Sequence, residues 1–295
     1  MVPPGFSLAS SSTAPAVKPR TLALPALALP ALAWLALWFA GPLLLVAAAS
    51  LSTRGQPITW SFSTNAWQEL TSPPVLRVLL RTLTLAAATT AGTILTGAPL
   101  AWLITRLPSR KANLLLGLVM LPLAANSLVL VYSWMGLLSR DGILGKLSSA
   151  LGITPASGQW LYTPTASLIG MIHYFLPFMV WPLMNSLQKL DGRLLEAAAD
   201  LGASPRQTFL HIVLPLIRPG IAAGSTLVFI QAAGTFVIPD LLGGSRDLLA
   251  GTMIYHRFAG QNLDWPGGAA LSVLVMTLLM SGLLIVRKLQ RSSDA

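Results

Sequence analysis

The residue types that perform enzymatic or metal chemistry are sparse in this chain and poorly spaced for it. There is no cysteine, so a thiol nucleophile, a disulfide framework and a cysteine-ligated metal are excluded. The three histidines, His173, His211 and His256, lie far apart in the sequence, and none belongs to an H-E-x-x-H pair. We therefore expect neither a catalytic residue nor a metal site.

The stretch GILGKL, residues 142–147, is the nearest approach to a nucleotide-binding loop. A phosphate-binding loop has four residues between its two glycines and a Ser or Thr after its lysine. Here only two residues separate Gly142 from Gly145, and Leu147 follows the lysine. We interpret the stretch as a turn in a loop, and we expect no cofactor to bind this chain.

Residues 190–215 form a polar loop between two apolar runs, and their types predict a short helix followed by a sharp turn. Asp191 can cap a helix that starts near Gly192, and Gly202 supplies the left-handed position that commonly ends a helix. The apolar residues of this helix recur at roughly helical spacing and form one stripe: Leu194, Leu195, Ala198 and Leu201.

A second short helix is predicted directly after the turn. Ser204 and Gln207 have the spacing of a capping box, and Pro205 occupies the first turn. Proline disfavours helical geometry in the residue before it, so Leu214–Pro215 predicts an interruption of this helix. We expect both short helices to lie outside the lipid.

The surface of the first short helix indicates what it contacts. A helix that lies on a bilayer carries Lys and Arg on its polar face and large apolar residues opposite. Here the polar face is acidic, with Glu196 and Asp200, and the apolar face is rich in alanine. Alanines allow another backbone to approach closely. We therefore favour docking of a protein partner over contact with the membrane surface.

The elements that flank this loop are long and apolar. Of the 295 residues, 54% are hydrophobic and 9% are charged, whereas soluble domains carry about 25% charged residues. About 20 apolar residues cross the hydrocarbon core of a membrane. We predict an all-α polytopic membrane protein with six transmembrane helices within 21–53, 82–105, 112–139, 164–188, 219–239 and 265–286. The transmembrane domain is then 21–289, between a disordered tail at 1–20 and a short tail at 290–295.

The distribution of basic residues argues for a membrane partner and against nucleic acid. The net charge is +10, but Lys and Arg punctuate the apolar runs and form no cluster. If the N-terminus is placed in the cytoplasm, twelve of the nineteen Lys and Arg residues lie on the cytoplasmic side. This excess predicts that both termini and the 190–215 loop are cytoplasmic.

Polar side chains inside the predicted spans are candidates for a translocation pathway, because they are costly in lipid and usually face the protein interior or water. The alternative for each is a hydrogen bond between helices, worth about 0.6 kcal/mol on average. A cationic substrate would favour a carboxylate and aromatic faces, and our hypothesis for that role pairs Asp240 with Tyr132 or Trp134. The candidates are Asn126, Ser127, Tyr132, Trp134, His173, Tyr174, Gln231 and Asp240.

The 190–215 loop resembles the cytoplasmic loop signature of ABC-importer permeases. That signature reads E-A-A, three residues, G, nine residues and I-x-L-P. The matching positions are Glu196, Ala197, Ala198, Gly202, Ile212, Leu214 and Pro215. The resemblance implies a type I ABC-importer permease fold in a bacterial inner membrane. It also implies that the loop, between helices four and five, holds a coupling helix that docks on a cytosolic ATPase.

Three further stretches look like the spermidine/putrescine permease family: TPTASLIGMIHYFLPFMVWPL (163–183), PGIAAGSTLVF (219–229) and DWPGGAA (264–270). This resemblance implies a polyamine as the solute and a second, related permease chain. It implies two copies of an ATPase, which would bind the ATP and magnesium that this chain does not. It also implies a periplasmic or lipid-anchored protein that delivers the substrate.

Other functions stay open from the sequence. Ala124 and Leu130 stand where the polyamine permeases have an aromatic residue and an arginine. The same type of permease for ferric iron, an opine or an organic anion is therefore an alternative. A channel or sensor without an ATPase is another, and it predicts that Glu196 and Gly202 have no role in transport.

Overall fold

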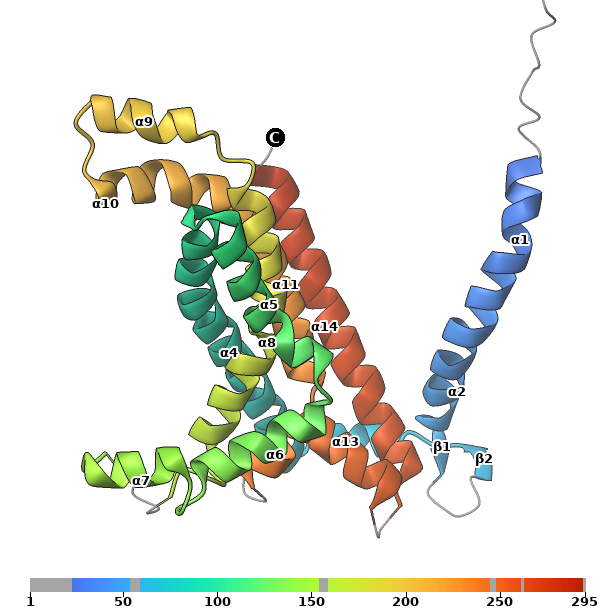
Figure 1. The fold of residues 1–295 in the computed structure, drawn as a ribbon. Helices are drawn as coiled ribbons and strands as arrows, with labels where there is room; N and C mark the ends of the chain where they lie inside the picture. The colour runs from blue at the N-terminus through green and yellow to red at the C-terminus, as the bar shows by residue number, and fades with distance from the viewer. Residues whose placement is uncertain (1–22, 54–58, 154–158, 245–247, 261–262, 294–295) are drawn as a thin grey trace, which may run out of the picture. The chain divides into compact units, whose positions relative to one another are not determined.

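The computed structural model describes residues 23–53, 59–153, 159–244, 248–260 and 263–293, and nearly all of these are helical (Figure 1). Contacts divide the chain into two units, residues 1–45 and 46–295. Among the described residues, five helices are long and apolar enough to cross a membrane, and one bent pair would make a sixth. The expected all-α, polytopic membrane fold is confirmed. The tail expected at 1–20 lies outside the described residues.

The first unit is an apolar helical run. Helix α1 (Ala23–Leu35) passes through a π-helical turn, η1 (Ala36–Ala40), into α2 (Gly41–Ala49), whose last residues belong to the second unit. The 22 residues Ala28–Ala49 have the length and hydropathy of a membrane span. Large apolar side chains such as Trp34 and Phe39 are exposed along this run, as expected of a helix that is apolar on every face.

The second unit begins with a small hairpin and a short helix. Strands β1 (Ser52–Thr53) and β2 (Thr59–Phe62) pair antiparallel, with Ser52 opposite Phe62. Helix α3 (Asn65–Leu70) follows and packs against α14 (Trp265–Ser293) near the end of the chain. Leu70 and Leu271 belong to the small apolar core formed there.

Three long helices, α4 (Pro73–Arg106), α8 (Pro164–Leu187) and α11 (Leu214–Gly234), form the main core, and each packs against the other two. Met171, Phe175 and Met179 of α8 are fully buried at its centre. Helix α4 starts well before the charge-free run at 82–105, because an extended Ser72 and two prolines set its first turn.

Two glycines allow the close contact between α8 and α11. Gly220 faces Pro182 and Ser186, and Gly224 faces Met179, so that an added Cβ at either glycine would overlap these atoms. Both glycines are buried. Small residues let helix backbones approach in a membrane. The G-x-x-x-G spacing in the sequence therefore marks a real helix contact.

The third predicted span, 112–139, is wrong as a single helix. Helix α5 (Ser109–Ala124) ends, and α6 (Ser127–Leu138) with α7 (Ile143–Ala150) leaves it at 104°. Asn126 has an extended backbone, and its side chain accepts a hydrogen bond from the Leu128 amide, which caps α6. Hydropathy detects apolar residues but not a capping residue. The stretch 142–147, interpreted as a turn, contains the start of α7.

The interruption expected at Leu214–Pro215 is also wrong. Helix α10 (Pro205–Thr208) passes through a π-helical turn, η2 (Phe209–Val213), into α11, and Arg206–Gly234 forms one continuous span. The Leu214 amide bonds to the Phe209 carbonyl in this wider turn, directly before Pro215, which has no amide hydrogen. At its other end α11 stops at Gly234, and α12 (Val237–Gly243) contains the last residues expected in the fifth span.

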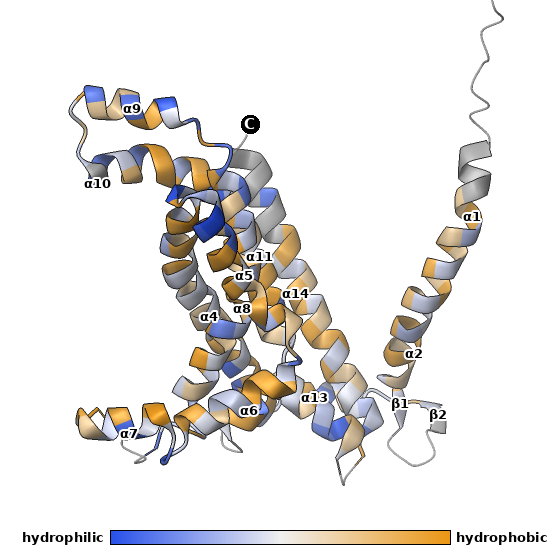
Figure 2. Ribbon diagram, viewed as in Figure 1, coloured by the Kyte–Doolittle hydropathy of each residue, from blue (hydrophilic) through white to orange (hydrophobic). Residues whose placement is uncertain are grey.

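The helices of the second unit have two distinct ends (Figure 1). Helix α9 (Gly192–Asp200) and α10 project from one end, called here the α9 end. Helices α6, α7 and α13 (Ala250–Ala259) lie at the opposite end, called the α7 end. The hydropathy of these elements also differs. The long helices are largely apolar, whereas hydrophilic and apolar residues alternate along α9 (Figure 2).

Candidate functional site

Helix α9 is fixed at both termini in the way the sequence predicted. Asp191 Oδ1 accepts a hydrogen bond from the Arg193 amide at 3.0 Å and caps the start. At the other end Gly202 has a φ of 76°, and the amides of Gly202 and Ala203 bond back to helical carbonyls. These two bonds form a Schellman motif, whose left-handed residue tolerates a Cβ poorly.

The predicted capping box of the next helix is also present. Ser204 Oγ lies 3.4 Å from the Gln207 amide, and Gln207 Oε1 accepts from the Ser204 amide at 2.8 Å. The turn between α9 and α10 therefore has hydrogen bonds on both sides. A turn held in this way can carry a displacement of α9 into α10 and onward into α11.

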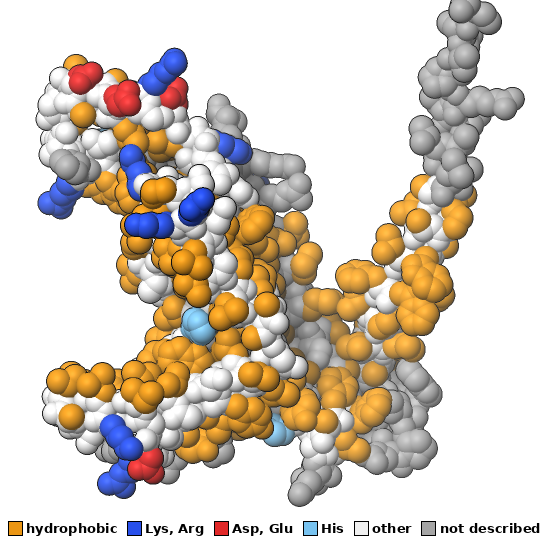
Figure 3. Space-filling view, viewed as in Figure 1, with side chains coloured by type: hydrophobic (Ala, Val, Ile, Leu, Met, Phe, Trp, Pro, Cys, Tyr) orange, Lys and Arg blue, Asp and Glu red, His pale blue; other side chains and the backbone are white. Residues whose placement is uncertain are grey.

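Helix α9 packs one face on the protein and leaves the other face exposed. Ala198 is buried, and Leu195 packs against the main core. Leu201 is 88% exposed, and Glu196 and Ala197 are exposed as well. Figure 3 shows carboxylates gathered on the surface of this helix. A small apolar surface beside acidic groups, uncovered by the described part of the chain, suits a protein partner.

The remaining signature residues lie at the base of the loop. Ile212 and Leu214 are half-buried, Leu214 packs against the main core, and Val213 between them is buried. Pro215 is exposed at the start of α11. These positions join the loop to the transmembrane helices, whereas Glu196, Ala197 and Gly202 belong to its projecting part.

Two of the pathway candidates contact each other. The indole N–H of Trp134 on α6 donates to Nδ1 of His173 on α8 at 3.1 Å. The two rings meet nearly edge to face, with 5.6 Å between their centroids. Trp134 is half-buried and His173 is exposed, so this pair links α6 to α8 and still presents a polar ring at the surface.

Five other candidates are separate from this pair. Asn126 forms the cap of α6 and Ser127 follows it, half-buried. Tyr132 is exposed on α6, while Tyr174 on α8 and Gln231 on α11 are half-buried. Within the described chain, no hydrogen bond or ring contact joins these five side chains to one another.

The structure pairs Asp240 with a histidine on a neighbouring helix. Asp240 lies on α12, and its carboxylate is 3.8 Å from Nε2 of His256 on α13, which makes an ion pair when the imidazole is protonated. Beside His256, the Tyr255 ring stacks on Phe236 with 5.0 Å between the ring centroids. A carboxylate next to accessible aromatic rings can attract an organic cation. Phe236 and Tyr255 are aromatic residues of this region that the sequence did not single out.

Asp240 also differs from other carboxylates at the α7 end. Glu69 and Asp264 both bind Arg257, and Asp141 lines a pocket with two basic side chains. In the described chain, Asp240 is paired with the imidazole of His256. A cationic solute could therefore engage this carboxylate without displacing an arginine or a lysine.

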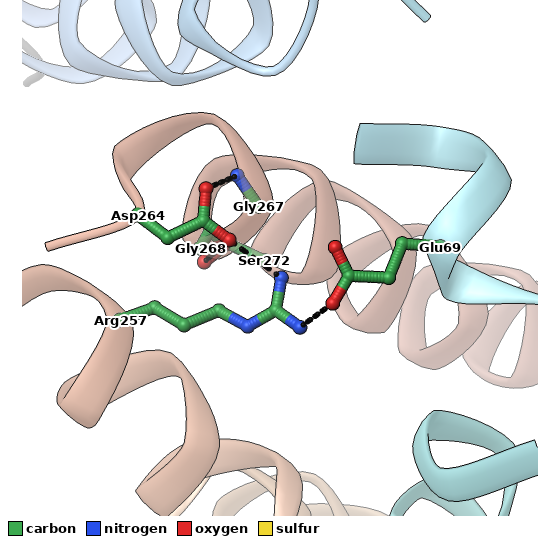
Figure 4. A network of polar contacts seen from close by, with 6 residues as sticks. All are labelled: Glu69, Arg257, Asp264, Gly267, Gly268 and Ser272. Carbon is green, nitrogen blue, oxygen red and sulfur yellow. Dashed lines mark hydrogen bonds and ion pairs between the residues drawn. The ribbon is translucent and has the colours of Figure 1, made fainter. Parts of the chain in front are cut away.

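A buried arginine that the sequence analysis did not select organises the same region (Figure 4). Arg257 Nη2 donates to Glu69 Oε1 at 2.9 Å, and Nη1 donates to Asp264 Oδ2 at 3.3 Å. Asp264 Oδ1 accepts from the Gly267 amide in the first turn of α14. A Cβ on Gly267 would overlap both charged groups, which explains a glycine in the D-W-P-G-G stretch. In the sequence, the D-W-P-G-G stretch was the signal that could have pointed to this ion network.

The arrangement suits binding and movement better than chemistry. Among the residues with described positions, no group of three or more His, Asp or Glu side chains could hold a metal ion. The polar side chains occur as pairs at helix contacts and helix ends. The two main features are the projecting helix α9 at the α9 end and a polar and aromatic cluster, with Asp240, His256 and Tyr255, at the α7 end.

Comparisons with known proteins identify the class. The family described as binding-protein-dependent transport system inner membrane component matches residues 93–293, a range that includes the α9–α10 loop and most of the core helices. The chain belongs to this family, and it is a permease subunit of an ABC importer. The resemblance stated from the signature residues is confirmed.

Individual proteins of known name or structure are also similar to this chain. The chain is 39% identical over 255 residues to the spermidine/putrescine transport system permease protein PotB of Escherichia coli (strain K12), covering 86% of this chain and 92% of PotB. The inner membrane ABC transporter permease protein YdcU of the same strain is 36% identical over 232 residues, covering 75% of this chain and 74% of YdcU. A chain from the crystal structure of a bacterial ABC transporter involved in alginate import has a TM-score of 0.75 at 20% identity, covering 92% and 96% of the two chains. This likeness confirms the fold.

Proposed function

We propose that this permease subunit carries a polyamine, or a closely similar organic cation, across the bacterial inner membrane. The observation that carries the proposal is the 39% identity to PotB over 86% of the chain. The chemistry at the α7 end supports it, because Asp240 contacts His256, whose ring in turn meets Tyr255, and Tyr255 stacks on Phe236. A flexible polyammonium ion is matched by a carboxylate and by aromatic faces.

The energy comes from a cytosolic ATPase dimer that binds ATP and magnesium. One ATPase subunit holds the exposed face of α9, and its closure on ATP moves α9. The hydrogen-bonded turn at Gly202 and the continuous passage from α10 into α11 support this route, because they join α9 stiffly to a core helix. A ligand-driven shift between two states needs such a connection to reach the membrane helices.

A second, related permease chain completes the pathway. None of the cavities found in the described part of the chain gathers the candidate side chains, and His173 and Tyr132 are exposed there. Facing these surfaces toward a partner would give a polar route between two subunits. A periplasmic or lipid-anchored binding protein delivers the solute, in keeping with the name of the family.

The α9 end faces the cytoplasm in this proposal. Arg106, Arg110, Lys111, Lys189 and Arg206 belong to segments at that end, and basic residues favour the cytoplasmic side. Helix α14 also runs toward that end (Figure 1), which supports a cytoplasmic C-terminus in this proposal. The α7 end then faces the periplasm, and the solute meets Asp240 before it passes Trp134, His173 and Gln231.

Uptake by the reconstituted importer tests the proposal. The chain is assembled with its partner permease, its ATPase and its binding protein in proteoliposomes, and radiolabelled spermidine uptake is measured with and without enclosed ATP. We expect ATP-dependent spermidine uptake that putrescine inhibits and that organic anions or ferric iron do not. Uptake of an anion or of ferric iron with no uptake of polyamines would overturn the substrate. Equal uptake without ATP would overturn the coupling to an ATPase.

A further inference from the structure

Helix α7 carries a narrow apolar stripe with no covering element in the described chain. Ile143, Leu147 and Leu151 are 73%, 53% and 63% exposed, respectively. Their spacing of four residues places them on one face. Gly145 and Ser149 lie on the opposite face of the same helix. The helix is therefore amphipathic, with large aliphatic side chains on its exposed apolar side.

The position of α7 in the fold determines which way this apolar stripe faces. The α6–α7 segment leaves the apolar helix α5 at 104°, so it runs across the end of the bundle (Figure 1). Eight helical residues extend about 12 Å, which is too short to cross a membrane. Figure 3 shows apolar side chains along the side of α7 that faces the α9 end, and charged side chains on the side facing away. The stripe thus faces the level occupied by the lipid.

The opposite side of α7 is polar and basic. Arg140, Asp141 and Lys146 line a pocket of about 600 Å³ together with Gln159 and Trp160. Two basic residues against one acidic residue favour anionic headgroups, and tryptophan is enriched at membrane–water interfaces. Lysine can also extend its ammonium toward the headgroups while its methylene chain stays near apolar surface.

We propose that α7 is an interfacial anchor that lies in the headgroup region of the membrane leaflet at the α7 end. Ile143, Leu147 and Leu151 enter the boundary with the acyl chains, and Arg140 and Lys146 contact lipid phosphates. Helices of this kind bury their apolar face about 5–10 Å into that boundary. The anchor is independent of the transported solute.

The size of the stripe favours lipid over a protein partner. Three aliphatic side chains cover much less than the roughly 800 Å² per partner that a stable protein interface buries. A bilayer needs no matched partner surface, and its apolar layer already surrounds the adjoining helix α5. Leu114, Leu118 and Leu121 of α5 are likewise large, exposed apolar side chains.

The anchor has a consequence for the polar cluster. Helix α6 continues into α7, and α6 packs against α12, which carries Asp240. A membrane-bound α7 therefore restrains the position of α12 through α6. The lipid surface becomes part of the support for the mouth of the pathway.

Single-cysteine labelling tests the anchor, and the chain contains no cysteine to remove. Leu147→Cys and the matched control Ser149→Cys lie on opposite faces of α7. Each is labelled with a nitroxide in the assembled importer, reconstituted in vesicles of phosphatidylethanolamine and phosphatidylglycerol. Collision with oxygen, which concentrates in lipid, is compared with collision with a water-soluble nickel complex. Ile143→Cys, one turn earlier, repeats the test if the first variant assembles poorly.

We expect the label at 147 to collide severalfold more with oxygen than with the nickel complex, and the label at 149 to show the reverse. Preference for the nickel complex at 147 would place the stripe in water and overturn the anchor. Protection of 147 from both reagents in the assembled importer would identify a protein cover, such as the partner permease, and would also overturn it.

Discussion

Arg257 and Glu69 are 188 positions apart in the sequence, and their side chains meet at 2.9 Å. The arginine side chain is 10% exposed and also reaches Asp264, so one guanidinium joins two carboxylates from α3 and from the start of α14. The contact fixes α13, on which Tyr255 and His256 precede Arg257. The geometry around Asp240 therefore depends on an ion network whose central arginine is largely buried.

Replacing Arg257 by methionine should destabilise the permease clearly. The change keeps an unbranched side chain but removes the guanidinium that both carboxylates bind. Loss of one partner from a buried ion pair costs about 3–5 kcal/mol, and the partial exposure of Glu69 places this case near the lower bound. The melting temperature of the purified chain measures the effect. Arg140→Met, at an exposed position, is the control, and equal melting temperatures would contradict the network's role.

Gly224→Leu should separate α11 from α8. The new side chain would overlap Met179, which is fully buried in the core, so the helices must move apart. We expect a lower melting temperature and weaker assembly with the partner permease. Gly117→Leu on α5 has open space and should leave both unchanged. A stable, normally assembled Gly224→Leu variant would show that this contact does not determine the packing.

Gly202→Val should uncouple transport from ATP hydrolysis while leaving membrane insertion intact. A β-branched residue is strained at a φ of 76°, so the turn between α9 and α10 would lose its geometry. Binding of the ATPase to purified permease measures the effect, together with ATP-driven uptake. Gly192→Ala, at the first position of the same helix with open space around it, is the control. Normal coupling in Gly202→Val would favour the channel or sensor.

Asp240→Asn should weaken the uptake of a cationic solute and leave the assembly of the importer unchanged. The amide keeps the shape of the side chain but removes the charge that faces His256. We expect the KM for spermidine uptake to rise about tenfold, corresponding to about 1.4 kcal/mol. Asp141→Asn, in the pocket beside α7, should leave KM unchanged. An unchanged KM in Asp240→Asn would exclude this carboxylate from the pathway.

Local signals predicted the α9–α10 loop well. Asp191, Gly202 and the Ser204–Gln207 box act through backbone bonds within a few residues, and the structure contains each of these bonds. Long apolar runs likewise located most of the spans, because length and hydropathy decide whether a helix can cross lipid.

Features that depend on tertiary contacts were not predictable in this way. The break at Asn126 follows from a cap in the middle of an apolar run, and the proline at 215 is accommodated by a π-helical turn. The Arg257 network joins residues from three separate elements, and no spacing in the sequence reveals that pairing. The role of Asp240 in a pathway stays a prediction, and the contact with His256 and the stacked Phe236–Tyr255 pair depend on how α12 and α13 pack.

Cross-linking from α9 tests the central claim most directly. Leu201→Cys places a thiol on the most exposed apolar side chain of the projecting loop, and Leu147→Cys places one at the opposite end of the bundle. In the assembled importer we predict that Leu201→Cys cross-links to the ATPase with a yield that changes when ATP binds, while Leu147→Cys gives no ATPase product. The account would be contradicted if Leu201→Cys reacted only with a membrane-impermeant thiol reagent added from outside, or formed no ATPase product in an importer that hydrolyses ATP and transports.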